Sequence, residues 1–245
     1  MYTREKFEEM RIEAAKEMRG SLSLSRDAIE LIEEASKYKW IHQTNWMGEP
    51  ALQLSQDLFM LQEIIYKTRP TLIVEVGVCW GGTALFCASA MKTFDIDGEI
   101  VGIDIYTPRD LKQRIGDKRV LYKLPPIELW TGNSIGEDIG GSIWRRARNH
   151  DNVLVILDSY HTHGHVLEEL KIYSQILRKG NYIVVCDTIV EDLQQQDERP
   201  WGKGNNPRTA LNQFLTENPN FERDEAIHDK MLVSCHPDGY IRKLS

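Results

Sequence analysis

The sequence predicts an α/β protein whose doubly wound, mostly parallel sheet ends in an antiparallel hairpin. Apolar runs rich in β-branched residues are typical of strands buried on both faces, and the chain carries four, at residues 71–78, 100–105, 152–158 and 182–187. Helical patterns between such runs indicate right-handed βαβ units, which build parallel sheets. Two further runs, Met231–Cys235 and Tyr240–Leu244, flank a Pro-Asp-Gly turn and predict the hairpin.

Helices are predicted before the first strand. Apolar residues recur at helical spacing over Thr3–Arg19 and Arg26–Tyr38, and a third helix is expected at Leu54–Lys67. The segment Trp40–Pro50 (WIHQTNWMGEP) has no clear period and contains glycine, so we expect a loop there. Pro70 closes this region.

The first half of the α/β region begins with the strand Thr71–Val78 (TLIVEVGV). An apolar helix is expected over Thr83–Met91, and a turn at Ile96–Gly98 leads to the second strand, Ile100–Ile105. A third strand is expected at Val120–Leu124.

The second half begins with the strand Asn152–Asp158 (NVLVILD). A helix over His165–Leu177, capped by Gly180, is expected to follow, and the strand Tyr182–Asp187 comes next. The polar segment Gln194–Arg199 is predicted to be a loop.

The composition excludes several classes of protein. Of the 245 residues, 27% are charged and 41% hydrophobic, as in soluble globular proteins. The net charge of −7 argues against a general nucleic-acid binder, which needs a basic face. No apolar run approaches the roughly 20 residues of a membrane span, and the charged N-terminal segment lacks a signal core, so we expect no membrane association and a cytoplasmic location. The four cysteines form no CxxC pair and are expected to be buried thiols.

Ligands of open parallel sheets bind at the carboxyl ends of the strands. The first strand ends with Glu75 and Gly77 and continues to Gly81 and Gly82, and glycines let a ligand approach the backbone and a helix N-terminus. Asp104 ends the second strand, where an acidic residue accepts hydrogen bonds from ribose hydroxyls. Each feature alone also suits a turn or a helix cap, but together they indicate a nucleoside-containing cofactor.

Other polar residues also follow predicted strands. Gly132-Asn133-Ser134 forms either a loop that flanks an adenine or a plain turn. Asp158 ends the fourth strand and Asp187 the fifth, so two carboxylates meet at one edge if these strands are neighbours. Oxygen ligands of this kind suit Mg²⁺. The alternative is that each aspartate caps the segment that follows it.

Three histidines, His161, His163 and His165 (HTHGH), follow the fourth strand. One of them is a candidate general base, because imidazole titrates near neutral pH, although solvent-facing and capping roles are alternatives. The cluster also resembles part of the H-x-H-x-D-H motif of metallo-β-lactamase-fold hydrolases, whose Asp-His end is absent here. After the fifth strand, Trp201 and Lys203 lie in a loop and either shape a pocket or form an ordinary surface turn.

The chain resembles the cephalosporin hydroxylase and rhamnosyl O-methyltransferase family over about residues 40–245. The segments that carry the resemblance are LIVEVGVCWGGTA, VGIDI, LDSYHTHGHVLEELKIY, YIVVCDTIVED, PWGKGNNPRTALNQFL and HPDGYIRKL. The resemblance implies a class I, Rossmann-like methyltransferase core with a seven-stranded sheet. Residues 70–245 would form this S-adenosylmethionine-binding domain. Residues 1–69 would form a helical and loop extension that covers the acceptor pocket or makes an oligomer interface.

The resemblance also implies ligands for both cofactors. The residues expected to hold S-adenosylmethionine are Glu75, Gly77, Trp80, Gly81, Gly82, Thr83, Asp104, Asn133, Ser134 and Asp158. Those expected to hold Mg²⁺ are Asp158 and Asp187. The family tends to have a glutamate ligand just before the second aspartate, where this chain has Cys186. That ligand is therefore absent, or is replaced by water or by the hydroxyl of Thr188.

The function that the resemblance implies is O-methylation of a small molecule, a sugar or a secondary metabolite, at a hydroxyl group. S-adenosylmethionine would supply the methyl group, Mg²⁺ would assist, and His161 or His163 would take the proton. A homo-oligomer is expected. Two alternatives are a metal-dependent hydrolase that uses the histidine cluster and a non-catalytic family member that binds the cofactor only.

Overall fold

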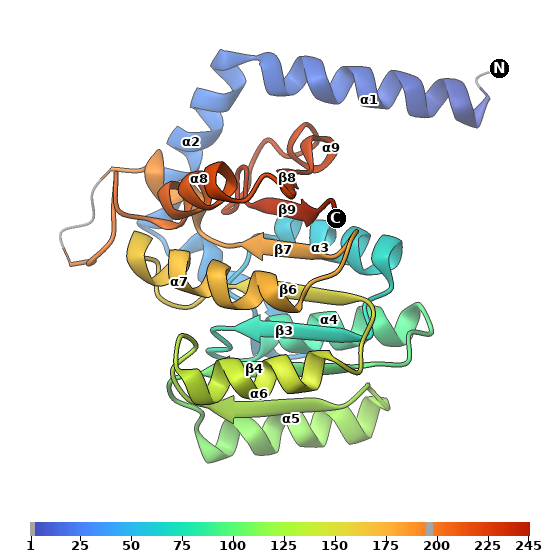
Figure 1. The fold of residues 1–245 in the computed structure, drawn as a ribbon. Coiled ribbons are helices and arrows are strands. Elements are labelled where there is room, and N and C mark those ends of the chain that lie inside the picture. Colours follow the sequence, from blue (N-terminus) through green and yellow to red (C-terminus); the bar gives the residue numbers. More distant parts are fainter. Residues whose placement is uncertain (1–2, 195–197) are drawn as a thin grey trace.

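The centre of the computed structural model, which describes residues 3–194 and 198–245, is a seven-stranded sheet (Figure 1). The strands are β3 (Leu72–Val76), β4 (Glu99–Asp104), β5 (Ile127–Thr131), β6 (Val153–Leu157), β7 (Tyr182–Val185), β8 (Phe221–Arg223) and β9 (Tyr240–Lys243). Their order is β5-β4-β3-β6-β7-β9-β8, and only the pairings of β9 with β7 and β8 are antiparallel. The predicted fold class is confirmed.

The direction of the winding changes between β3 and β6. From β3 the chain proceeds outward to β4 and β5, and it then returns to β6 on the other side of β3. The carboxyl ends of these strands, which point to the left in Figure 1, therefore border a crevice of the kind in which open α/β sheets bind ligands.

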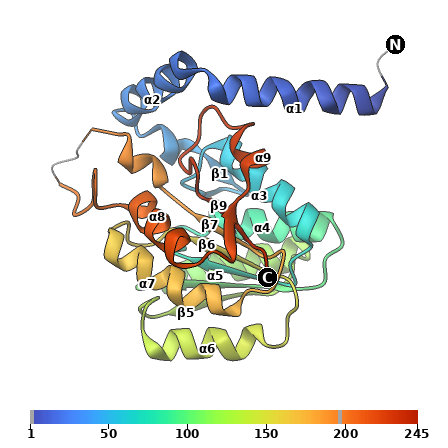
Figure 2. The same cartoon turned by 45° about the horizontal axis from the view of Figure 1, so that its top comes forward.

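Helices cover both faces of the sheet (Figures 1 and 2). One face carries α3 (Ser55–Thr68), α4 (Gly82–Thr93) and α5 (Arg109–Tyr122), and the other carries α6 (Glu137–Ala147), α7 (His163–Tyr173) and α8 (Pro207–Glu217). Along β3, Ile73 packs into the apolar cluster formed with α3, α4 and α5. Leu72 and Val74 pack into the cluster on the opposite face, formed with α6, α7 and α8. This strand is buried on both faces, which explains why its sequence is a continuous apolar run.

Two helices precede this domain, α1 (Arg4–Gly20) and α2 (Leu22–Ser36). The Thr3 and Ser21 hydroxyls accept hydrogen bonds from the first turns of α1 and α2, as N-caps do. Figure 2 shows α1 extending away from the sheet domain, and none of its residues is buried, whereas α2 buries Ala28 and Ile32. The first three predicted helices are thus present.

The predicted loop at Trp40–Pro50 contains short stretches of regular secondary structure. It contains the 3-10 turn η1 (Trp40–Gln43) and a two-stranded ribbon formed by β1 (Asn45–Trp46) and β2 (Glu49–Pro50). The remaining short elements are η2 (Ser174–Ile176), η3 (Thr188–Glu191) and α9 (Glu225–His228).

The strand predicted at Val120–Leu124 is wrong. These residues end α5, and Val120 and Leu121 are more than 70% exposed. The buried face of α5 is formed by Leu111 and Ile115 instead, which are one helical turn apart. The true third strand is β5, an edge strand in which polar residues interrupt the apolar pattern.

The first strand of the predicted hairpin is also wrong. The turn exists, since the Gly239 N–H donates to the His236 carbonyl, but β9 pairs with β8 and not with Met231–Cys235. The Ser234 hydroxyl and the Cys235 N–H both donate to the buried carboxylate of Asp57 on α3. These donors therefore tie the segment to a helix and keep it out of the sheet.

Three smaller outcomes concern the second half of the chain. Gly180 does not cap α7, which ends at Tyr173; it lies in the turn before β7, and its N–H donates to the Lys243 carbonyl. The central part of the loop predicted at Gln194–Arg199, residues 195–197, lies outside the described residues. In the described part of the chain, no helix is long and apolar enough to cross a bilayer.

Candidate active site

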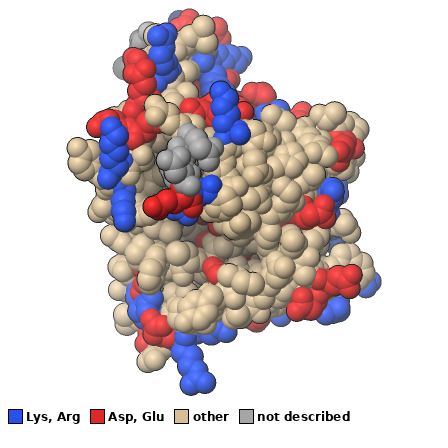
Figure 3. Space-filling view, turned by 90° about the vertical axis from the view of Figure 1, so that its left-hand side faces the viewer, with Lys and Arg blue, Asp and Glu red and all other residues tan. Residues whose placement is uncertain are grey.

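A cavity of about 850 Å³ opens at the carboxyl edge of the sheet. Its floor is formed by the ends of β3, β4, β5 and β6 and by the loops that follow them. Its roof is formed by residues from α2, η1, β2 and the η3 region. Figure 3 looks onto this edge, where the surface is hollowed and acidic atoms lie within the hollow. The volume suits a ligand of cofactor size.

The glycines after β3 make room for neighbouring backbone. Gly77 has φ +92°, and a Cβ there would lie 2.0 Å from the carbonyl oxygen of Asp158. Gly81, with φ +80°, is the N-cap of α4, and a Cβ on Gly82 would lie 2.4 Å from the Pro50 carbonyl oxygen. Among these glycines only Gly77 lines the cavity, so Gly81 and Gly82 shape the loop without bordering the ligand space. Trp80 is half exposed and does not line the cavity either.

Glu75, at the end of β3, is a buried acid without a complete set of partners. It lines the cavity, is 3% exposed, and its Oε2 has no hydrogen-bond partner among the described residues. Burial raises its pKa well above the ordinary value, and the charges of Asp158 and Asp104 raise it further. A buried acid in this state fits a cationic group of a ligand, such as the ammonium group of S-adenosylmethionine.

Asp104 is held in place by the loop after β3. Its Oδ2 accepts from the N–H groups of Val78 and Cys79, both at 3.0 Å, and its Oδ1 accepts from the Tyr106 N–H. A carboxylate has about four lone-pair positions, so it retains capacity for a ligand hydroxyl. The position beside the cavity fits the predicted ribose contact.

The remaining predicted cofactor residues also line the cavity. The Thr83 hydroxyl donates to the Ala51 carbonyl at 2.9 Å, which links α4 to the roof. Asn133 accepts from the Ile135 N–H, and the Ser134 hydroxyl donates to Glu169 at 2.6 Å. The predicted loop Gly132-Asn133-Ser134 thus borders the cavity.

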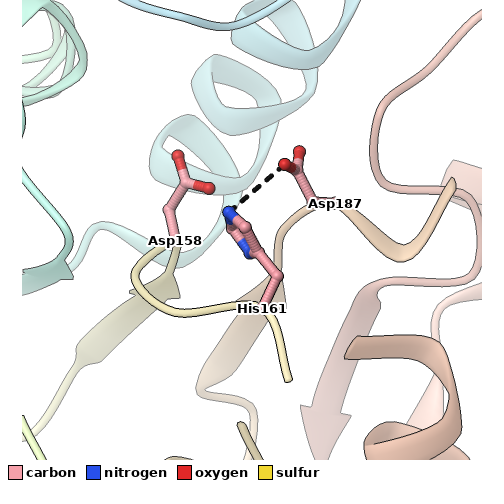
Figure 4. Close-up of side chains that lie close together, drawn as sticks. All are labelled: Asp158, His161 and Asp187. Atoms are coloured by element: carbon pink, nitrogen blue, oxygen red, sulfur yellow. Dashed lines mark ion pairs between the residues drawn. The ribbon is translucent and has the colours of Figure 1, made fainter. Parts of the chain in front are cut away.

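Asp158, Asp187 and His161 converge at the centre of the edge (Figure 4). One ligand atom from each residue lies within 4.8 Å of the other two, and His161 Nε2 is 3.3 Å from Asp187 Oδ2. Burial raises the pKa of Asp158 well above its ordinary value, and the neighbouring Asp187 raises it further. Two facing carboxylates and a ring nitrogen fit a divalent cation.

Gln53 and His236 fix this cluster from behind, and the sequence analysis did not identify either. The Asp187 N–H donates to His236 Nδ1 at 3.0 Å, so His236 Nε2 carries the proton and donates to Gln53 Oε1. The Gln53 amide in turn donates to Asp158 Oδ2 at 2.9 Å. Both side chains are 1% exposed, so this relay of hydrogen bonds holds the two aspartates in a fixed relation.

Cys186 and Thr188, the two neighbours of Asp187 in the chain, do not add an oxygen ligand. Cys186 is buried and does not line the cavity, and burial raises the pKa of its thiol well above the ordinary value. The Thr188 hydroxyl donates to the Pro237 carbonyl, and its side chain is fully buried. The structure therefore does not bring Thr188 to the cavity, where His161 occupies the third position.

The three histidines of HTHGH have separate surroundings. His163 lies between α7 and α8, with Nδ1 2.8 Å from the Thr209 hydroxyl and Nε2 2.9 Å from Gln213 Oε1. It does not line the cavity, so the structure does not place it where it could accept a proton from the acceptor. His165 lines the cavity, but its Nε2 lies 3.1 Å from buried Glu169. Only His161 meets both aspartates.

Aromatic rings border the same space. Tyr160 packs edge-on against Trp201, with 5.5 Å between the ring centroids. Trp201 packs edge-on against His161, with 5.0 Å between the ring centroids. Tyr160 and Trp201 both line the cavity, whereas Lys203 does not. Tyr160 was not among the predicted site residues, although its place between Asp158 and His161 in the chain was a usable signal.

The comparisons with known proteins agree with this fold. The family model described as Rhamnosyl O-methyltransferase/CmcI matches residues 38–244. A rhamnosyl O-methyltransferase of Mycobacterium leprae (strain TN) is 30% identical over 202 residues, which cover 81% of this chain and 82% of the relative. A rhamnosyl O-methyltransferase of Mycobacterium tuberculosis (strain ATCC 25618 / H37Rv) is 26% identical over 212 residues, 83% and 82% of the two chains.

Solved structures of CmcI share the fold. An apo form has a TM-score of 0.60 at 16% identity and covers 83% of this chain and 77% of its own. A form described with Mg and SAM has a TM-score of 0.58 at 18% identity, with 83% and 78% covered.

These matches decide between the alternatives. The predicted family and the prediction of an S-adenosylmethionine-dependent O-methyltransferase are confirmed, and the matches do not favour the hydrolase that was built on the histidine cluster. The histidines agree with this, because they do not form one site. On the match over residues 38–244, the chain belongs to the rhamnosyl O-methyltransferase/CmcI family.

Proposed function

We propose that this O-methyltransferase binds S-adenosylmethionine across the carboxyl ends of β3, β4 and β5 and transfers its methyl group to a hydroxyl of a small molecule under the roof of the cavity. The observation that carries this proposal is the unpartnered carboxylate oxygen of Glu75 at the cavity wall. A cationic ligand group would stabilise the ionised form of this buried acid, and the cofactor carries an ammonium group.

Each cofactor residue then has a role that its surroundings support. Glu75 binds the ammonium group and Asp104 accepts from the ribose hydroxyls. Asn133 and Ser134 flank the adenine on the floor of the cavity, and the exposed ring of Tyr160 offers it a flat surface. Gly77 lets the loop pass close to the backbone of Asp158 and Ser159, just after β6.

The acceptor hydroxyl is expected beside Asp158, His161 and Asp187. The two aspartates would hold a divalent cation, which when bound supplies a Lewis acid that lowers the pKa of the acceptor hydroxyl. When the cation is absent, His161 Nε2 is the group that takes the proton, because it is the one predicted histidine that reaches this place. Gln53 and His236 keep the aspartates aligned.

The roof supports a small acceptor with both polar and apolar faces. It is lined by Ile32, Trp40, Ile41, Leu52 and Leu193. Tryptophan faces and aliphatic side chains pack against the C–H faces of sugars and against other ring systems. The relatives named as rhamnosyl O-methyltransferases make a glycoside with a deoxysugar the first acceptor to try. These contacts support the acceptor-side cover as the role of α2, η1 and the residues after β2, whereas no residue of α1 lines the cavity.

A methyl-transfer assay tests this proposal. The purified protein is supplied with methyl-labelled S-adenosylmethionine, Mg²⁺ or Mn²⁺, and a panel of glycosides and hydroxylated metabolites. Transfer to at least one hydroxyl is expected, and Asp104→Ala should lose it, whereas Asp110→Ala, at the exposed start of α5, should not. Failure to bind S-adenosylhomocysteine in calorimetry would overturn the proposed cofactor site.

A homo-oligomer also belongs to the proposal. The helix α1 has no buried residue, yet it exposes Phe7, Met10 and Ile12. A helix of 17 residues gains most of its stability from packing, so a second copy of the chain is the expected partner. Light scattering of the full chain and of a Phe7→Glu/Met10→Glu variant tests this, with a monomeric wild type as the contrary result.

A further inference from the structure

We infer that His161 supplies the nitrogen of a mixed nitrogen–oxygen metal site, so that the site prefers a first-row transition ion such as Mn²⁺ or Co²⁺ over Mg²⁺. This inference rests on the cation site proposed above, and it adds which ion that site selects. It depends on three features: the position of the ring, the oxygen ligands that are missing, and the way in which the aspartates are held.

The ring of His161 is already in place beside the two carboxylates. Its Nε2 lies 3.3 Å from Asp187 Oδ2, and the three candidate ligand atoms lie within 4.8 Å of one another. The edge of the ring packs against Trp201 at an interplanar angle of 87°, and the side chain is only 12% exposed. The imidazole therefore needs no large rearrangement to become a ligand, and Figure 4 shows it pointing between the aspartates.

The described residues offer no third carboxylate at this place. The metal-ligating group comprises Asp158, His161 and Asp187 alone. The side chain before the second aspartate is the buried thiol of Cys186, and the hydroxyl of Thr188 is used in its contact with Pro237. The protein thus provides two oxygens and one nitrogen, and water or the acceptor hydroxyl must fill the other positions.

This donor set favours a different ion from an all-oxygen site. Mg²⁺ prefers carboxylate and water oxygens, whereas imidazole suits the later first-row divalent ions, whose affinities rise from Mn²⁺ through Fe²⁺ to Co²⁺. The oxygen ligands are fixed by other groups, because Gln53 holds Asp158 and His236 holds the backbone of Asp187. His161 is then the ligand that sets the selectivity.

One lone pair on Nε2 cannot serve two roles at once. A neutral imidazole has one acceptor nitrogen, which binds either a proton or a metal ion. In the metal-loaded protein His161 would therefore be a ligand, a bound cation would lower the pKa of the acceptor hydroxyl, and the proton released on methyl transfer would pass to solvent water. Proton acceptance by His161 is then confined to the metal-free protein.

Electron paramagnetic resonance tests the ligand directly. The purified, metal-free full chain is loaded with Mn²⁺, and electron spin-echo modulation is recorded for wild type, His161→Gln and His163→Gln. Modulation from a directly bound ¹⁴N is expected in the wild type and in the His163→Gln control, and it should be absent in His161→Gln. A Mg²⁺ titration that displaces the Mn²⁺ should need about 10-fold less Mg²⁺ in His161→Gln than in the wild type.

The outcomes separate this inference from the function on which it rests. Mn²⁺ that binds without nitrogen modulation in the wild type would overturn the role of His161 and leave the carboxylate site intact. Equal Mg²⁺ displacement in wild type and His161→Gln would overturn the selectivity. Absence of Mn²⁺ binding altogether would overturn both this inference and the cation in the proposed function, but not the cofactor site, which S-adenosylhomocysteine binding tests independently.

Discussion

Replacement of Glu75 by glutamine is expected to stabilise the cofactor-free protein and to weaken its binding of S-adenosylhomocysteine. The carboxylate is buried and its Oε2 has no hydrogen-bond partner in the described structure. Burial raises the pKa of this group well above its ordinary value, and the charges of Asp158 and Asp104 add to the shift. The amide removes an unfavourable buried charge, but it also removes the proposed partner of the ligand's ammonium group.

The direction of the pH effect follows from the raised pKa. A glutamate of this kind contributes its full stability below its unfolded-state pKa of about 4.3, and that contribution is lost as the pH rises through the folded-state pKa. Glutamine does not titrate. The wild type should therefore lose stability relative to Glu75→Gln as the pH rises above about 4, until the difference becomes constant above the folded-state pKa. Thermal unfolding of the cofactor-free proteins over this range measures it.

The effect on binding has the opposite sign. A hydrogen bond to a charged group contributes about 1.5–3 kcal/mol, which corresponds to a loss of roughly 10- to 150-fold in affinity for S-adenosylhomocysteine. Calorimetry with 5′-methylthioadenosine, which lacks the ammonium group, provides the matched ligand control and should show no change. An unchanged affinity for S-adenosylhomocysteine, or an equal loss for both ligands, would refute the assignment of Glu75.

Three further predictions concern residues around the site. Gly77→Ala should destabilise the protein by about 3 kcal/mol or more, because its Cβ meets the neighbouring backbone and its φ is positive. Gly180→Ala, at positive φ in open space, should lose only the free energy of the backbone strain, and denaturant unfolding compares the two variants. Gln53→Leu leaves buried partners on both sides of the relay unsatisfied and should lower the free energy of unfolding by about 2–5 kcal/mol and weaken Mn²⁺ binding, and a stability equal to wild type contradicts the relay. His163→Gln should lower stability by about 1–2 kcal/mol with kcat unchanged, since the ring bonds to Thr209 and Gln213 of α8 and does not line the cavity; a large fall in kcat would return it to the site.

The strands at the buried centre of the sheet could be predicted from the sequence. Strands such as β3 and β6 are buried on both faces, so their apolar runs follow directly from the fold. The edge strand β5 is only partly buried and carries Glu128 and Thr131, and its pattern was therefore weaker than that of the exposed apolar end of α5. The apolar pattern by which a strand is recognised depends on how much of the strand is buried, and an edge strand such as β5 is buried least.

The residues of the candidate site also fall into a group that the sequence could predict and a group that it could not. The ends of strands gave Glu75, Asp104, Asp158 and Asp187 because topology alone brings such residues to one edge. The relay from Gln53 could not be predicted, since its contact with His236 spans 183 residues and follows no local pattern.

The place of β9 in the sheet sets the order in which the protein acquires its structure during synthesis. β9 lies between β7 and β8, and His236 precedes it by four residues. A ribosome adds about 5–20 residues per second, so the segment that carries Asp187 waits several seconds before this strand and this histidine leave the ribosome. The antiparallel end of the sheet and the contact between His236 and Asp187 therefore form last, and a translation product that stops before residue 236 lacks both.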